Sequence, residues 1–266
     1  MGGKFKLLNE IIPLFPSSID VFVDLFGGGM NVGINVESNK LVYNDIDAHV
    51  VELMEYLRYT ETYELLIEID NLISEYGLSK ENQEGFLKLR DYYNMTNNSP
   101  VIFYTIICYA FNNQIRFNQS GKYNMPFGKN RSSFNPTLRK KFVDFVEELH
   151  KKNVLFTNVD FTNFNFDKLD SNDFVYCDPP YLNSVASYNE QNGWTERHER
   201  SLLGLLDELN NGSIRFALSN NLKYSNPLLY VWKDKYNVHY LSGNYSNCNY
   251  HKIDRSKDVE VLITNY

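Results

Sequence analysis

The segment 20–45 constrains the fold of this chain more than any other. Asp20–Leu25 reads Asp-Val-Phe-Val-Asp-Leu, and such runs of β-branched and aromatic residues are typical of a buried strand. The run continues into Phe26-Gly27-Gly28-Gly29, after which we expect a helix to begin near Met30. Lys40–Asn44 predicts a second strand, which ends at Asp45. A strand, a glycine loop, a helix and a second strand in this order form the first unit of a parallel sheet.

The remainder of the chain also alternates strand and helix patterns, which predicts a doubly wound, Rossmann-like α/β sheet. Further strands are expected at Val154–Thr157, Phe174–Cys177, Ile214–Leu218 and Glu260–Tyr266. Helices are expected at Leu65–Tyr76, Gln83–Tyr93, Pro100–Phe111, Leu138–Leu149 and Glu196–Leu209. Because residues 54–148 are mostly helical, with a loop and hairpin pattern at 112–136, they are interpreted as a domain inserted between the sheet segments 1–53 and 149–266.

The glycine loop and Asp45 together suggest a site for an adenosine cofactor. Gly27 and Gly29 allow a tight turn and a close approach to a ligand, and Asp45, 21 residues after Asp24, is placed to accept ribose hydroxyls. The spacing to Gly33 is one residue too long for the dinucleotide fingerprint, so a pyrophosphate is not favoured. S-adenosyl-L-methionine, which carries no phosphate, suits the pattern. A purely structural turn is the alternative.

The tetrapeptide Asp178-Pro179-Pro180-Tyr181 directly follows the apolar strand Phe174–Cys177. The Asp178 carboxylate and the Pro179 carbonyl can each accept one N–H of an exocyclic amine, which aims the nitrogen lone pair at a methyl group. The fixed φ of proline sets the direction of the carbonyls, and Tyr181 can stack on a base. The alternative is a strand followed by an ordinary Pro-Pro turn.

The charges of the chain are unevenly distributed. The net charge is −7, yet no Asp or Glu lies between Asp91 and Asp144. This stretch carries Arg116, Lys122, Lys129, Arg131, Arg139, Lys140 and Lys141. It is a candidate surface for a polyanion, or otherwise a solvated basic face. A base inside a duplex must be flipped out to reach a pocket, and Phe111, Asn112, Gln114 and Arg116 are candidates to fill the gap or to read a guanine.

Composition bears on the cellular setting. The three cysteines are far apart and form no metal-type pair, which favours a reduced cytoplasmic protein without a metal site. The longest apolar run, Val101–Phe111, is too short to span a membrane, and the start of the chain does not have the pattern of a signal peptide.

These motifs together resemble the Dam-type, alpha-class N6-adenine DNA methyltransferases. The resemblance extends over nearly the whole chain, in family order. Its motifs are Gly2-x-Lys4 with Leu7-Leu8, Asp24-Leu25-Phe26-Gly27-Gly28-Gly29, Asn44-Asp45, Phe111-Asn112-x-x-x-Arg116-x-Asn118, Gly121-x-Tyr123-Asn124-x-Pro126-Phe127-Gly128, Asp160-Phe161, Asp178-Pro179-Pro180-Tyr181, Ser219-Asn220 and the strand from Glu260 to Tyr266. An aromatic residue that the family usually has four positions before the lysine has no counterpart, so either the start is truncated or cofactor binding at that end is altered.

The resemblance implies a site-specific, adenine-specific DNA methyltransferase that uses S-adenosyl-L-methionine. Residues 1–53 and 149–266 would be the catalytic domain, and 54–148 the target-recognition domain. Asp178, Pro179, Pro180 and Tyr181 would be catalytic. Lys4, Asp24, Phe26, Gly27, Gly29, Asp45, Ile46, Asp160, Phe161 and Asp178 would bind the cofactor, with Ile46 and Phe161 on either side of its adenine. Phe111, Asn112, Gln114, Arg116, Asn118, Lys122, Pro126, Lys129 and Arg131 would contact DNA, and Arg116 would read a guanine.

The resemblance also implies partners and a target. The partner would be double-stranded DNA, bound by a monomer or a weak dimer, with no membrane and no metal, and the family's frequent target is GATC. Two other functions stay open at this point. One is methyl transfer to RNA or to a protein glutamine amide, which the basic stretch and the acid before Pro-Pro disfavour. The other is a catalytically silent, sequence-specific DNA-binding protein, which would predict a damaged donor site.

Overall fold

The computed structural model describes residues 4–96, 99–183, 193–223, 226–241 and 259–266 of the 266-residue chain. It divides into two compact units. One unit joins Gly2–Ile46 with Asn153–Tyr266, and the other comprises Asp47–Lys152. The sequence analysis placed the boundaries of the insertion at 54 and 148, several residues further inside.

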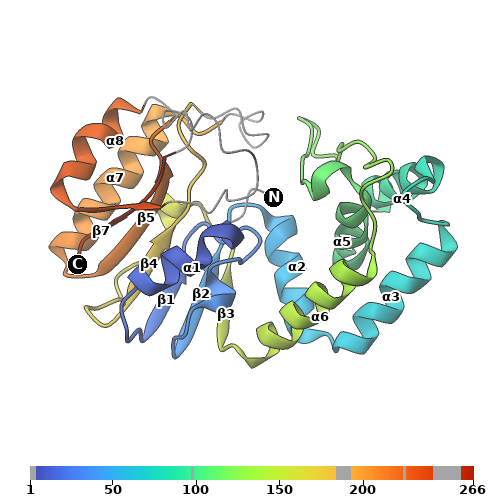
Figure 1. Ribbon diagram of the computed structural model, residues 1–266, viewed down its shortest axis with the longest axis horizontal. Helices are drawn as coiled ribbons and strands as arrows, with labels where there is room; N and C mark the ends of the chain where they lie inside the picture. Colours follow the sequence, from blue (N-terminus) through green and yellow to red (C-terminus); the bar gives the residue numbers. More distant parts are fainter. Residues whose placement is uncertain (1–3, 97–98, 184–192, 224–225, 242–258) are drawn as a thin grey trace, which may run out of the picture. The chain divides into compact units, whose positions relative to one another are not determined.

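The first unit contains a seven-stranded sheet in the order β3-β2-β1-β4-β5-β7-β6 (Figure 1). The strands are β1 (Val21–Asp24), β2 (Lys40–Asn44), β3 (Val154–Thr157), β4 (Phe174–Cys177), β5 (Arg215–Asn221), β6 (Asn237–Leu241) and β7 (Glu260–Thr264). Strands β3, β2, β1, β4 and β5 are parallel to their neighbours, whereas β7 is antiparallel to both β5 and β6. The mixed α/β class and the expected strands are therefore confirmed, and β6 is a strand that the pattern did not predict.

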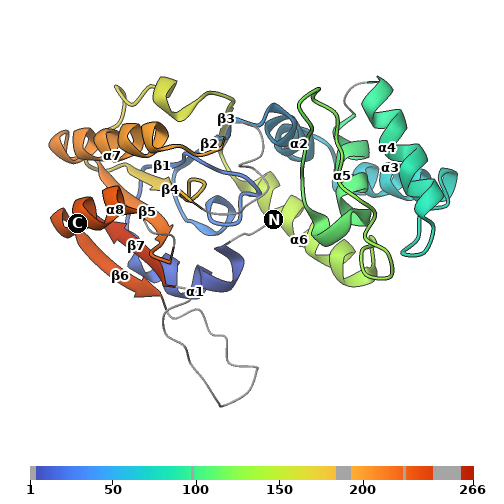
Figure 2. The same ribbon diagram turned by 90° about the horizontal axis from the view of Figure 1, so that it is seen from above.

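Helices cover both faces of this sheet, which explains why its central strands are apolar throughout. Helix α7 (Glu196–Asn211) and helix α8 (Pro227–Trp232) pack on one face, where Leu202, Leu206 and Phe216 are fully buried. The short helix α1 (Leu8–Ile11) lies on the other face (Figure 2). Burial of each such side chain contributes about 1.5–3 kcal/mol, so α7 holds the sheet mainly through its leucines.

The helix expected to begin near Met30 is absent, and that prediction was wrong. Only a 3-10 turn forms, at Gly33–Asn35. Gly28 and Met30 both have positive φ, 46° and 54°, so the backbone turns back instead of entering a helix. The Gly33 N–H donates to Oδ2 of Asp24 at 3.1 Å, which ties the segment to the end of β1.

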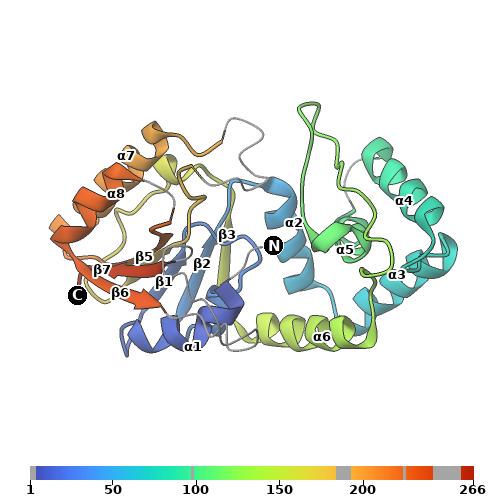
Figure 3. The ribbon, with the colours of Figure 1, turned by 45° about the horizontal axis from the view of Figure 1, so that its top comes forward.

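The second unit is helical. Its helices are α2 (Ala48–Tyr59), α3 (Thr62–Glu75), α4 (Gln83–Thr96), α5 (Pro100–Tyr109) and α6 (Pro136–Lys151). Helix α5 is apolar and buried nearly all round, because α2, α3 and α4 pack against it. The apolar run 101–111 is thus the core of this unit, and α2 is a helix that the sequence analysis missed. A long irregular segment joins α5 to α6 (Figure 3).

Candidate active site

The loops that follow the parallel strands lie at the carboxyl edge of the sheet. The chain runs from β1 outward to β2 and β3, and then returns to β4 on the other side of β1. The point between β1 and β4, where the direction of winding reverses, is where open α/β sheets bind ligands. Asp24 ends β1 on one side of this point, and Asp178 follows β4 on the other.

The glycine loop after β1 is packed so closely at Gly27 that this residue cannot be larger. A Cβ on Gly27 would lie 2.2 Å from Cε2 of Tyr43, and the Tyr43 hydroxyl donates to the Gly28 carbonyl at 2.6 Å, so the ring cannot move away. The Gly28 N–H in turn donates to Oδ2 of Asp45 at 2.8 Å. The loop and the Asp45 carboxylate are therefore held together as one structure.

The side chain of Asn44 holds the backbone that leads into Asp45. This buried side chain donates to the carbonyls of Leu25 and Val159, both at 3.0 Å. Its own oxygen accepts from the Val159 N–H at 3.2 Å and the Thr157 hydroxyl at 2.9 Å. Since one amide ties together the loops after β1, β2 and β3, the asparagine that precedes the acid has a structural role.

Asp24 is a buried acid with an unusual proton affinity. Its side chain is 2% exposed, and burial raises its pKa to about 7 although the hydrogen bond from Gly33 opposes the shift. The negative charges of Asp178 and Asp45 raise the pKa further. A buried carboxylate with this pKa, at the end of a strand beside a switch point, is a candidate partner for a cationic ligand.

The two residues expected on either side of a cofactor adenine differ in burial. Phe161 is 5% exposed and packs on Phe26 and Trp194, with ring centroids 5.4 Å and 5.5 Å away, whereas Ile46 is 69% exposed. Asp160 accepts from the Thr162 N–H at 2.8 Å, which fixes the turn before Phe161. The proposed sandwich of Ile46 and Phe161 stays a prediction.

Trp194 has the contacts of a loop anchor. Its indole N–H donates to the buried Glu199 at 2.5 Å, and its ring lies 5.7 Å from that of Phe26. Gly2, which the sequence analysis placed in the N-terminal motif, lies outside the described residues.

Asp178 belongs to a partly buried ionic cluster at the same edge of the sheet. Lys4 Nζ lies 3.4 Å from Oδ1 of Asp178 and 2.9 Å from Oε2 of Glu260. The Tyr181 hydroxyl contacts Lys4 Nζ and lies 3.3 Å from Asp178 Oδ1 and 3.2 Å from Glu260 Oε2. Asn221, at the end of β5, donates to Glu260 Oε1 at 2.9 Å.

The cluster perturbs the proton affinities of its members. Burial raises the pKa of Asp178, the positive charge of Lys4 opposes that shift, and the charge of Glu260 adds to it. Burial alone would lower the pKa of Lys4, but Asp178 and Glu260 outweigh it and leave that pKa raised. Sequence reasoning assigned no role to Glu260, and the only signal was a single acid at the start of an otherwise apolar strand.

The helical unit carries the hairpin residues predicted to contact DNA. Arg116 is half-buried, and Asn124 accepts from its Nε through the side-chain oxygen at 2.8 Å and from Nη2 through the backbone carbonyl at 3.1 Å. Phe117 and Tyr123 form an antiparallel bridge across the hairpin. The Asn94 side chain pairs with the Tyr123 backbone on both sides, donating at 3.0 Å and accepting at 2.8 Å. Asn124 thus holds the guanidinium of Arg116, and Asn94 anchors the backbone of the hairpin that carries both residues.

The other predicted DNA contacts differ in exposure. The half-buried ones are Gln114 and Asn118, and the exposed ones are Phe111, Asn112, Lys122, Pro126, Lys129 and Arg131. The Arg131 guanidinium lies over the ring of Phe111, 5.4 Å from its centroid.

In the basic stretch, Arg139 binds Asp70 through two hydrogen bonds of 2.7 Å and 2.8 Å, and Lys140 pairs with Asp144 at 2.8 Å. Two of the seven cations are therefore neutralised by acids of the same unit.

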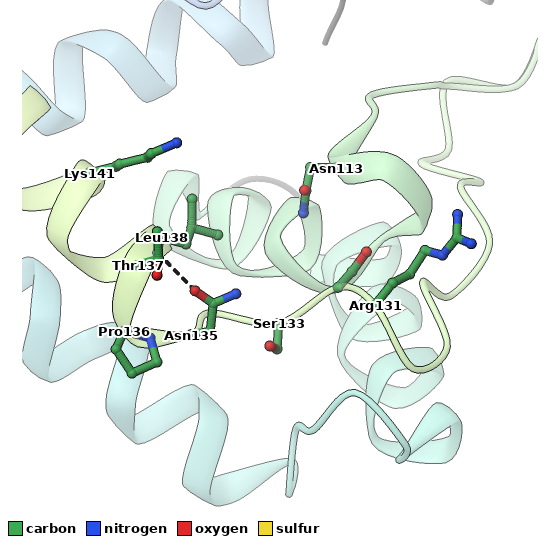
Figure 4. Close-up of a pocket in the computed structure, with 9 residues that line it drawn as sticks. Asn113, Arg131, Ser133, Asn135, Pro136, Thr137, Leu138 and Lys141 are labelled. Atoms are coloured by element: carbon green, nitrogen blue, oxygen red, sulfur yellow. Dashed lines mark hydrogen bonds between the residues drawn. The ribbon is translucent and has the colours of Figure 1, made fainter. Parts of the chain in front are cut away.

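A pocket of about 490 Å³ opens at the start of α6 (Figure 4). Arg131 and Lys141 lie on opposite sides of it, and the remaining lining is polar or apolar but not acidic. Asn135 caps α6 by accepting from the Leu138 N–H at 3.0 Å. The pocket therefore adds a positive surface to the same unit as the hairpin.

The described part of the chain holds no group of three or more His, Cys, Asp or Glu side chains able to bind a metal ion. None of its helices has both the length and the apolar character needed to cross a membrane.

A seven-stranded sheet of this kind, with a glycine loop after β1 and Asp-Pro-Pro-Tyr after β4, is consistent with a Rossmann-like methyltransferase. Residues 1–247 match the family model of the D12 class N6 adenine-specific DNA methyltransferase, and the chain belongs to this family.

Named relatives agree with this assignment. The chain is 52% identical over 273 residues to the Type II methyltransferase M.FokI of Planomicrobium okeanokoites, and 42% identical over 275 residues to the Modification methylase StsI of Streptococcus sanguinis. Both alignments include 100% of this chain but 42% of the relative, so the chain spans about two fifths of their length. It is also 25% identical over 230 residues to the DNA adenine methylase of Escherichia coli (strain K12), covering 83% of this chain and 78% of that protein.

Proposed function

We propose that this chain transfers a methyl group from S-adenosyl-L-methionine to N6 of an adenine flipped out of a short duplex DNA site. The observation that supports the proposal most directly is the geometry of Asp178. This acid follows β4 at the switch point of the sheet, opposite the glycine loop, and Lys4 and Tyr181 hold its carboxylate. The family assignment favours DNA over RNA or a protein amide as the substrate.

The residues present fit the cofactor. Asp24 is a buried acid whose charge is disfavoured by burial, and a cationic ligand would stabilise that charge. The side-chain nitrogen of Asn220, at the end of β5, is buried and has no hydrogen-bond partner among the described residues, which suits a site completed by a ligand. Asp45 would hold the ribose, and Phe161 with Ile46 the adenine. The cofactor supplies an electrophilic methyl group on a sulfonium.

The catalytic work of the chain is to orient the target nitrogen. The Asp178 carboxylate and the Pro179 carbonyl would each accept one N–H of the amine, so that its lone pair points at the methyl group. These acceptors also stabilise the positive charge that develops on the nitrogen. Lys4 and Tyr181 contact Oδ1 of Asp178, and these contacts would help to hold the carboxylate in place for the amine.

The helical unit would bind the duplex and select the site. Asn124 accepts from Nε and Nη2 of Arg116 and so orients the guanidinium, through which a guanine would be read. Exposed Lys122, Lys129 and Arg131 would contact phosphates, and such contacts offset the few kcal/mol that base flipping costs. The residues near Arg116 do not single out GATC, so the target should be read experimentally.

The test of the chemistry is Asp178→Ala with Asp167→Ala as the matched control, since Asp167 is an exposed acid of the same unit. Methyl transfer from labelled cofactor to duplex DNA and DNA binding by fluorescence anisotropy would both be measured. We expect Asp178→Ala to lose transfer and keep binding, and the control to keep both. Turnover retained by Asp178→Ala would refute the assigned mechanism.

The test of recognition is to map methylated adenines by long-read sequencing in a host that expresses the chain. The map gives the target site directly, whether it is GATC or another. With Arg116→Ala we expect the site to become degenerate at one position or methylation to be lost. An unchanged map would exclude Arg116 as a reader of the site.

A further inference from the structure

The ionic cluster contains one carboxylate that the proposed reaction does not use. Lys4 is 6% exposed, and its ammonium is closer to Glu260, at 2.9 Å, than to Asp178, at 3.4 Å. The shorter contact of this buried lysine is therefore with Glu260. The contact with Asp178 is longer, although both carboxylates raise the pKa of Lys4.

The position of Glu260 is fixed from two directions. It opens β7, where it is the register partner of both Asn221 on β5 and Leu241 on β6. The Asn221 side chain also donates to Oε1 of Glu260 at 2.9 Å, which leaves Oε2 toward Lys4 and Tyr181. A carboxylate anchored by a strand and by a hydrogen bond keeps its place when its neighbours change protonation.

The charges in the cluster do not balance. One ammonium stands between two carboxylates, so the group carries one net negative charge when all three are ionised. Without Glu260, Lys4 and Asp178 would form a one-to-one pair, and the lysine would draw on the same carboxylate that must accept the target amine. The Tyr181 hydroxyl has a single proton to donate, and Glu260 at 3.2 Å competes with Asp178 at 3.3 Å for it.

We propose that Glu260 is a positioning residue that takes up the charge of Lys4 and the proton of Tyr181, so that the Asp178 carboxylate keeps its acceptor capacity for the target amine. The inference rests on the proposed function. It deepens that function by explaining how an acid beside a buried lysine stays a strong acceptor. The surplus negative charge also complements the positive charge that develops during methyl transfer to an amine.

The decisive variant is Glu260→Gln, which keeps the shape and one acceptor oxygen but removes the charge. We expect kcat to fall by about tenfold to a hundredfold, the loss typical of replacing a charged hydrogen-bond partner. The acidic limb of the pH profile should also move to lower pH, because the Glu260 charge raises the pKa of Asp178. Glu260→Asp keeps the charge, so it should restore the position of the limb.

The charged and titratable groups around Asp178 come from several elements. They are Lys4, Asp24 at the end of β1, Tyr176 and Cys177 on β4, Tyr181, and Glu260 on β7. The pKa of Asp24 is raised by the charges of Asp178 and Asp45. An acidic limb of the pH profile that was set by Asp24 alone would therefore not move in Glu260→Gln. A limb that stays in place in Glu260→Gln overturns the proposal.

A second measurement is independent of activity. The Asp178 carboxyl carbon can be titrated by NMR in labelled protein, with Asp178→Asn to identify its resonance. Its pKa should fall in Glu260→Gln and stay unchanged in Asp234→Asn, an exposed acid paired with Lys233. An unchanged or higher pKa in Glu260→Gln refutes the inference even if the chain methylates DNA. Conversely, the expected titration with no methyl transfer by the unmodified chain would refute the proposed function alone.

Discussion

Asp24→Asn should make the protein more stable at alkaline pH. Burial raises the pKa of Asp24 from 3.8 to about 7, so folding must take up a proton or tolerate a buried charge. Each tenfold change in proton affinity corresponds to about 1.36 kcal/mol, which puts the full cost of ionising Asp24 at about 4 kcal/mol. Asparagine has no charge to bury, and its oxygen can still accept from the Gly33 N–H.

The sign of the pH dependence follows from the protons bound. Between the pKa of about 4 that an aspartate has in an unfolded chain and the folded pKa of about 7, the folded state holds a proton that the unfolded state has lost. Stability therefore falls as pH rises through this window, and it levels off above it. Asparagine removes this slope, so the advantage of the variant grows with pH.

Urea unfolding of both proteins at about pH 6 and about pH 8.5 would measure the effect. The difference in free energy of unfolding should widen by roughly 1.4 kcal/mol, because about one pH unit of the window lies in this range. An unpaired asparagine amide would lower stability equally at both pH values, so the change in the difference isolates the titration. A difference that stays constant with pH would refute the reasoning. The same variant should bind the cofactor more weakly, since it lacks the charge proposed to face it.

Three further predictions test the loop, the hairpin and the basic surface. Gly27→Ala should abolish cofactor binding, measured by calorimetry, and should lower the free energy of unfolding by about 1–3 kcal/mol. Gly204→Ala is the control: a Cβ there meets open space, so the substitution should stabilise α7 by about 1 kcal/mol. Asn94→Ala removes both hydrogen bonds to the hairpin backbone and should cost about 1–3 kcal/mol, with faster hydrogen exchange confined to the hairpin. Arg131→Ala should reduce the salt dependence of DNA binding by about one counterion, whereas Lys140→Ala, whose charge is already paired, should leave it unchanged.

The sequence predicted the central strands of the sheet well because they are buried on both faces. Runs such as Phe174–Cys177 are apolar throughout, and glycine or proline follows within a few residues. The sequence therefore indicated both that these runs are strands and where they end. The motif acids Asp24, Asp45 and Asp178 were found for the same reason, since each lies at or just past the end of a strand. The exposed strand β6, which reads Asn-Val-His-Tyr-Leu, lacks this signal and was missed.

What the sequence could not provide was long-range pairing. Glu260 meets Lys4 across almost the whole chain, and periodicity within a segment says nothing about such a contact. The expected helix after the glycine loop failed because a hydrogen bond from Gly33 to Asp24 fixes a tighter turn. Likewise, the pairing of Arg139 with Asp70 on another helix removes a charge that appeared available in the linear sequence.

The split of the sheet across the insertion has a consequence for synthesis of the chain. β1 and β2 are synthesised before the other neighbour of β1, strand β4, which follows only after the whole helical unit. The helical unit is built from contacts among its own helices, α2 to α6, so it can fold while the sheet is still half made. During that interval the apolar edge of β1 lacks its partner. The nascent chain therefore carries an exposed edge that invites misassociation, and its expression should depend on chaperones more than that of a protein with a contiguous sheet.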